Sequence, residues 1–131
     1  MSKPDIQATL ERMLQSSIDL CRTLLKHNET FYPFASVAID GDIQCIFHSD
    51  GVHREHQIIE QLEDEIWART HQVQQSLSVL VYSGLMVDDR GHKRDVVVCD
   101  VTTQEGDQQQ IYYPINFACA NPQIGAPFTS E

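Results

Sequence analysis

The chain has 131 residues, of which 41% are hydrophobic, 8% aromatic and 21% charged, and this composition excludes a collagen-like chain, a disordered tail and a disulfide-dense miniprotein. Its formal net charge of −10 would repel nucleic-acid phosphates and anionic lipids, so neither nucleic acid nor a membrane surface is an expected partner. No apolar run approaches the roughly 20 residues that a membrane-spanning helix needs. The length predicts one domain.

The N-terminus alternates charged with apolar residues and has no continuous hydrophobic region, which predicts a cytoplasmic protein without a secretory signal. No two cysteines form a C-x-x-C pair, so the sequence excludes a zinc ribbon and a thioredoxin-like redox motif. In a reducing compartment we expect all four to be small hydrophobic side chains. They are Cys21, Cys45, Cys99 and Cys119.

The first predicted element is an amphipathic helix that opens at Ser2 and ends near His27 and Asn28. The segment Ser2 to Asp5 has the pattern of a capping box with an early proline. His27 and Asn28 suit the end of the helix, because a base favours the C-terminal dipole and asparagine tolerates a left-handed cap. Apolar residues follow at helical spacing: Ile6, Leu10, Met13, Leu14, Cys21, Leu24 and Leu25.

Two strand-like runs, 34–39 and 42–48, flank the pair Asp40 and Gly41. An aspartate–glycine pair between such runs is the strongest short-range signal for a two-residue hairpin with a type I′ turn. This turn predicts the register, with Ala38 opposite Ile43, Ser36 opposite Cys45 and Phe34 opposite Phe47.

The second half of the chain reads as a helix followed by three strands. Residues 54–73 place apolar side chains on one stripe and most of their acidic residues on the other face. Strand-like runs follow at 77–87, 94–103 and 109–117, joined by short polar connections that contain glycine, so we expect an antiparallel meander. These elements lie in a predicted domain of residues 1–119, and residues 120–131 are an expected extended tail rich in proline and glycine.

This order of elements predicts an α+β fold, with a five-stranded antiparallel sheet and two helices in the order α-β-β-α-β-β-β. Over residues 2–117 the order resembles the profilin-like folds, which include the PAS, GAF and roadblock light-chain domains. Roadblock is the nearest of these because it also opens with a helix. A nuclear-transport-factor-like cone, with the same elements curved around a pocket, is the alternative. Residues 31–34, between helix and strand, also resemble a set of uncharacterised small bacterial proteins. These resemblances imply no activity.

Three imidazoles and two carboxylates lie within residues 48–56, at a junction between a strand and a helix. A transition metal needs three or four nitrogen or oxygen ligands that converge, and the candidate ligands here are His48, Asp50, His53 and His56. The spacing of His53 and His56 is i, i+3, whereas zinc-binding pairs on helices usually stand at i, i+4. The alternative is that Asp50 caps the helix and the imidazoles are solvated.

No residue pattern identifies a reaction or a cofactor. The sequence has no nucleophile elbow and no glycine-rich phosphate loop, so we expect no catalytic residue and no nucleotide cofactor. The run Val96 to Val101 and residues 77–87 place apolar side chains on both faces of the sheet, although one face of an antiparallel sheet usually meets water. We therefore expect a homodimer joined through the second face or through an adjoining edge strand.

Three functions agree with these observations. The first is a non-enzymatic protein-interaction module that forms a homodimer and meets a basic protein partner through its acidic second helix. The second is a metal-binding enzyme or sensor that uses the cluster at residues 48–56. The third is an antitoxin-like or immunity-like protein whose negative charge neutralises a basic toxin.

Overall fold

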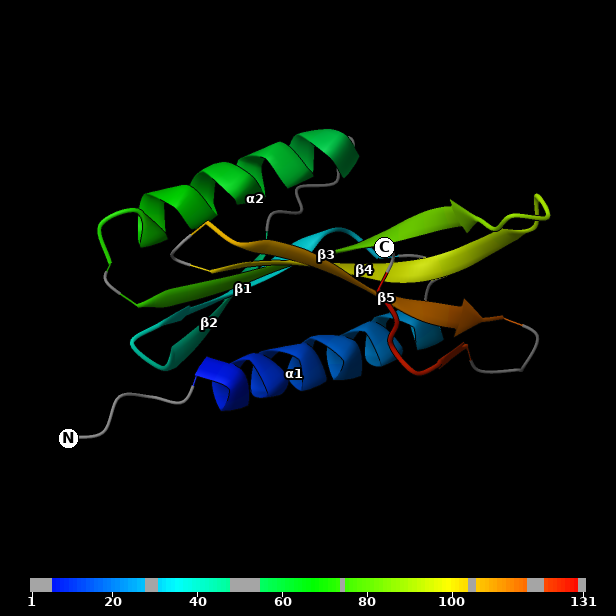
Figure 1. Cartoon of the computed structure of the whole chain (residues 1–131), viewed down its shortest axis with the longest axis horizontal. Coiled ribbons are helices and arrows are strands. Elements are labelled where there is room, and N and C mark those ends of the chain that lie inside the picture. Colours follow the sequence, from blue (N-terminus) through cyan, green and yellow to red (C-terminus); the bar gives the residue numbers. More distant parts are fainter. Residues whose placement is uncertain are drawn as a thin grey trace.

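The computed structural model describes residues 6–27, 31–47, 55–73, 75–103, 106–117 and 122–129. A central antiparallel sheet separates two helices, which lie on opposite faces (Figure 1). The strands follow the order β2-β1-β3-β4-β5-β6 across the sheet. The elements of the described residues are α1 (Ile6–His27), β1 (Phe34–Ile39), β2 (Asp42–Phe47), α2 (Glu55–Thr70), β3 (Ser76–Val87), β4 (Lys93–Thr103), β5 (Gln108–Asn116) and β6 (Gln123–Ile124).

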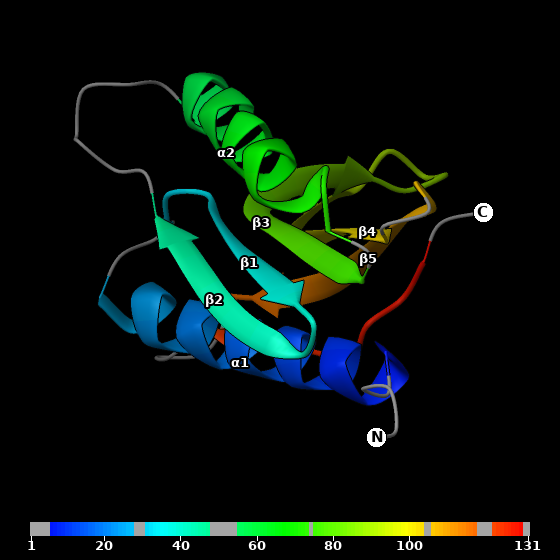
Figure 2. The same cartoon turned by 90° about the vertical axis from the view of Figure 1, so that its left-hand side faces the viewer.

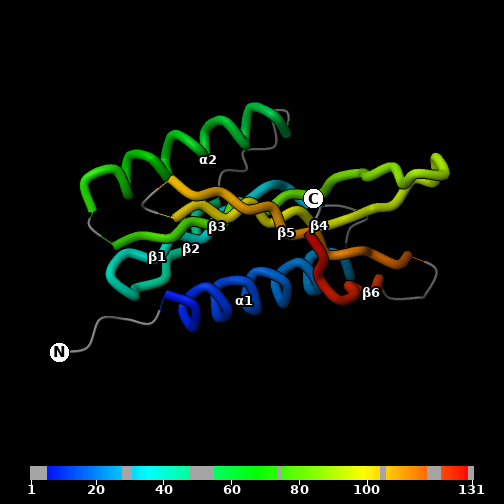
Figure 3. The backbone as a smooth tube through the Cα atoms, viewed as in Figure 1, coloured from blue at the N-terminus to red at the C-terminus, as the bar shows by residue number. Residues whose placement is uncertain are grey.

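The α+β class, the two helices and the antiparallel sheet are confirmed, whereas the prediction of five strands is wrong because the sheet has six. The additional strand, β6, lies in the segment predicted to be an extended tail. It pairs with the end of β5 for two residues, and Ile124 is buried there. A two-residue strand carries no periodic pattern, so the sequence gives no signal for it. Figure 3 shows this C-terminal segment beside β5.

The predicted hairpin and its register are confirmed. β1 pairs with β2 so that Phe34 is opposite Phe47 and Ser36 is opposite Cys45. Asp40 and Gly41 have φ angles of 51° and 86°, the left-handed values that a type I′ turn requires. The hairpin places β2 at the edge of the sheet, where Cys45 is exposed, although the sequence predicts a small hydrophobic side chain. Cys119 lies outside the described residues.

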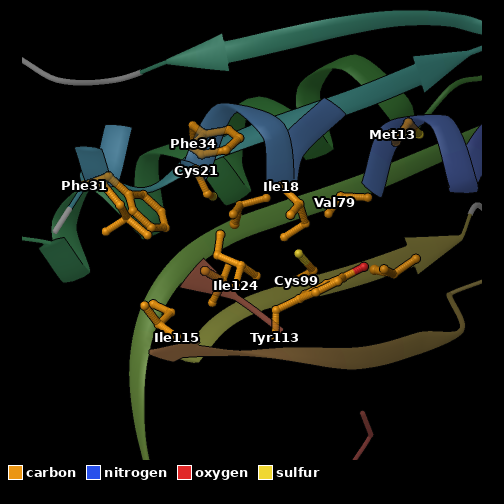
Figure 4. Close-up of a cluster of buried hydrophobic side chains, with 14 of the residues drawn as sticks. Met13, Ile18, Cys21, Phe31, Phe34, Val79, Cys99, Tyr113, Ile115 and Ile124 are labelled. Carbon is orange, nitrogen blue, oxygen red and sulfur yellow. The ribbon is translucent and has the colours of Figure 1, made fainter. Parts of the chain in front are cut away.

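The larger core lies between α1 and one face of the sheet (Figure 4). Met13, Cys21 and Leu25 are buried along one face of α1, as the helical spacing predicts. Burial raises the pKa of the Cys21 thiol above its usual range and that of Cys99 to about 12. Both thiols are therefore protonated at neutral pH and act as small hydrophobes, as expected from the sequence.

The second core lies on the opposite face, where α2 packs over β1 and β3 (Figure 2). Ile58 and Leu62 from α2 meet Ala35, Val37 and Leu80 from the sheet. The homodimer expected from the sequence assumes that no helix covers this second face. That assumption is wrong, because α2 covers part of it. One helix covers each face, so the apolar side chains of β3 between Leu77 and Val81, on both sides of the strand, need no second copy to bury them.

Candidate functional site

α2 leaves part of its sheet face uncovered, and a cleft of about 550 Å³ lies beside it. The helix crosses over β1 and β3, whereas the sheet continues through β4 and β5. The described lining residues come from α2, the segment after it, β3, β4 and the start of β5, and they are Glu63, Ile66, Trp67, Thr70, His71, Val73, Ser76, Ser78, Leu80, Asp100, Thr102, Thr103, Gly106 and Gln108. We call this hollow the α2-side cleft.

The α2-side cleft contains two carboxylates, Glu63 on α2 and Asp100 on β4. Asp100 is opposite Leu80 in the sheet, which places it on the face that α2 partly covers. Partial burial raises the pKa of Asp100 above its ordinary value of 3.8, because loss of water disfavours the charged form. No arginine or lysine belongs to the described lining, and none forms an ion pair with Asp100 among the described residues.

These carboxylates also affect the pKa of Tyr82, which packs against the second core, between α2 and the sheet. Burial is the main cause that raises the pKa of Tyr82, and the nearby charges of Asp100 and Glu63 raise it further. The only arginine on the described part of α2, Arg69, donates to Glu65 at 2.8 Å and to Gln44 of β2 at 2.8 Å. It is therefore engaged with β2, outside the cleft lining, so no arginine or lysine of the described lining balances the two carboxylates.

An aromatic pair lines the cleft on the side of α2. The rings of Trp67 and His71 stack with centroids 4.1 Å apart and an interplanar angle of 8°. His71 Nδ1 lies 2.9 Å from the carbonyl oxygen of Trp67, which ties the imidazole to the last turn of the helix. Trp67 is nevertheless 66% exposed. The cleft lining therefore combines an exposed aromatic ring with two carboxylates.

Replacing Asp100 with asparagine is expected to stabilise the fold at pH 7 by about 0.5 kcal/mol, a small gain because water still screens this half-buried group. The folded-state pKa of Asp100 is raised, so the ionised carboxylate costs stability above that pKa and the cost is lost as the pH falls toward 3.8. Urea unfolding of both proteins at a series of pH values checks this. A stabilisation that does not change with pH would contradict the assignment.

A second hollow, of about 460 Å³, lies on the other face between α1 and the C-terminal segment. Its lining includes Glu11, Arg22 and Tyr113. Arg22 donates to Asp19 at 2.9 Å. One guanidinium and one carboxylate therefore line this groove, so it lacks the excess negative charge of the α2-side cleft.

Three of the four predicted metal ligands, His48, Asp50 and His53, lie outside the described residues. The fourth, His56, is exposed near the start of α2. Within the described ranges no three histidine, cysteine, aspartate or glutamate side chains come together as a metal site would require. The metal site at residues 48–56 stays a prediction.

Sequence reasoning missed the residues that define the α2-side cleft. Asp100 interrupts the buried apolar run of β4 between Val96 and Val101, and an acid within this buried run is the available signal. Trp67 follows the acidic residues of α2, where a solvated face was expected. The sequence alone does not show that Trp67 and Asp100 lie near each other, because only the fold brings α2 and β4 to the same cleft.

No protein-family model matches this chain, and no curated protein or solved structure does either. Neither described helix is both long and apolar enough to cross a membrane.

Proposed function

We propose that the protein is a non-enzymatic cytosolic binding module whose α2-side cleft takes a basic segment of a partner protein. The observation that carries the proposal is Asp100, a half-buried carboxylate with a raised pKa in a cleft whose described lining holds no arginine or lysine. Carboxylates that are desolvated without a counter-charge cost stability and gather at functional sites. A lysine or arginine from a partner would supply the missing charge.

The shape of the cleft supports a short segment rather than a flat surface as the partner. Its volume of about 550 Å³ lies within the range of roughly 300–1,000 Å³ typical of ligand sites. Ile66 and Leu80 add apolar surface to the lining, and Ser78, which is only 5% exposed, adds a hydroxyl. The net charge of −10 would attract a basic partner over a longer range.

Fluorescence anisotropy with a labelled peptide rich in lysine and arginine tests this proposal. We expect binding that weakens as the ionic strength rises from about 0.1 M to about 1 M, because salt screens charge pairs. Asp100→Asn should weaken binding about tenfold, the loss of one charged hydrogen bond.

Glu11→Gln is the matched control, because it removes one negative charge from the groove beside α1 and leaves the α2-side cleft intact. It should change the affinity by less than about twofold, since exposed charges contribute little. Equal effects of the two substitutions would show that only the net charge matters, and would contradict a role for the cleft.

The immunity-like function and the two predicted fold families remain proposals. An immunity-like protein that neutralises a basic toxin would use the same chemistry, so the two differ in the partner and not in the site. The cleft beside the curled sheet supports the cone-like alternative, in which the sheet curves around a pocket. The helix-first order of elements supports the profilin-like alternative.

A homodimer is the second candidate, supported by the end of β3. β3 pairs with β1 only from Ser76 to Val81 and then continues to Val87. Leu85 and Val87 on this extension are 56% and 62% exposed. Two copies could bury them together, and light scattering at micromolar concentration would show twice the monomer mass. A clean monomer would remove this candidate and leave the cleft proposal standing.

A further inference from the structure

Trp67 provides a prearranged aromatic surface beside the α2-side cleft. His71 stacks on one face of the indole at 4.1 Å and is itself held against the backbone of Trp67. The indole is 66% exposed and lines the cleft, so part of the ring is accessible to a ligand. The orientation of the ring is already set by the stack, so little conformational entropy is lost when a ligand binds.

Negative charge lies close to this aromatic surface. Glu63 precedes Trp67 by one helical turn, and residues at i and i+4 are neighbours on a helix surface. Asp100 lines the same cleft from β4. A group that binds here must therefore present a flat surface to the indole and positive charge to two carboxylates.

A guanidinium group meets both conditions. It is planar, stacks on aromatic faces and presents several N–H donors in a fork that matches a carboxylate. A lysine ammonium also pairs with a carboxylate and is attracted to an aromatic face, but it is a compact and strongly hydrated charge without a flat surface that could stack on the ring. We propose that the α2-side cleft recognises an arginine side chain, with Trp67 stacked on the guanidinium and with Glu63 and Asp100 as its counter-charges. This inference rests on the proposed function and names its preferred ligand.

The emission of Trp67 reports directly on this site, because it is the only tryptophan of the chain. The probes are three short peptides in which glycine alternates with arginine, with lysine or with citrulline, the uncharged analogue of arginine. We expect the arginine peptide to change the emission and to bind about 3- to 30-fold more tightly than the lysine peptide, because only the planar guanidinium adds stacking on the indole to the attraction between cation and ring. The citrulline peptide should not bind measurably.

Trp67→Ala should remove this preference. In calorimetric titrations the variant should bind the arginine peptide about as weakly as the wild-type protein binds the lysine peptide, and its affinity for the lysine peptide should change by less than about twofold. Phe47→Ala is the matched control, because Phe47 is another exposed aromatic residue and does not belong to the cleft lining. It should keep the full preference for arginine.

The outcomes separate the two proposals. Equal affinity for the arginine and lysine peptides, or a preference that survives in Trp67→Ala, would overturn the arginine site and leave a general basic-segment site standing. Binding of neither peptide would overturn both proposals. Thermal unfolding of Trp67→Ala within a few degrees of the wild-type protein would show that the fold is kept, as expected for an exposed side chain.

Discussion

Replacing Phe34 with alanine is expected to lower the free energy of unfolding by about 3–5 kcal/mol, the range for a buried phenylalanine. Phe34 is 1% exposed and lies opposite Val81 on β3. Its ring contacts those of Phe31 and Phe47, with centroids 6.0 Å and 5.7 Å away. The substitution therefore leaves a cavity at the centre of the core between α1 and the sheet, and urea unfolding at equilibrium measures its cost.

Phe47→Ala is the matched control, because Phe47 is the cross-strand neighbour of Phe34 and is 58% exposed. Its loss should cost about 1 kcal/mol, the contribution of an aromatic pair at the edge of a sheet. Similar costs for the two substitutions would contradict the assignment of Phe34 to the core and of Phe47 to the surface.

Leu62→Ala is expected to lower the free energy of unfolding by about 2–5 kcal/mol. Leu62 is fully buried on α2 and belongs to the core that this helix forms with Ala35, Val37 and Leu80. A loss of this size in a single unfolding transition would show that α2 is an integral layer of the fold.

Glu60→Ala, on the exposed face of the same helix, should change stability by less than about 0.5 kcal/mol, since alanine also favours a helix. If Leu62→Ala behaved like this control, α2 would not be anchored to the sheet. The α2-side cleft would then have no fixed wall on the side of the helix.

Local patterns in the sequence predict most of the fold. The helical spacing between Ile6 and Leu25 and the type I′ pair Asp40 and Gly41 determine structure over a few residues, so the end of α1 and the register of the first hairpin are predicted correctly. The predicted capping box, Ser2 to Asp5, lies outside the described residues. The observed ends of α2, β3, β4 and β5 lie within three residues of the predicted ends, and the differences arise because helix and strand ends depend on contacts with the rest of the fold.

The position of α2 could not be predicted, because spacing shows that a helix is amphipathic but not which face of a sheet it covers. This placement decides whether the apolar residues of β3 and β4 are covered. It also brings Trp67 and Asp100, which are 33 residues apart in the sequence, to the same cleft. The cleft residues thus depend on long-range packing that no local pattern encodes.

The most direct test of the α2-side cleft as a binding surface is an NMR titration of isotope-labelled protein with the peptide of alternating glycine and arginine. We expect the largest changes in backbone amide signals at Trp67, Ser78 and Asp100, which line the cleft, and little change at Leu14 and Ile124 in the groove beside α1. Changes centred on the groove beside α1, or spread evenly over the surface, would contradict a binding site between α2 and the sheet.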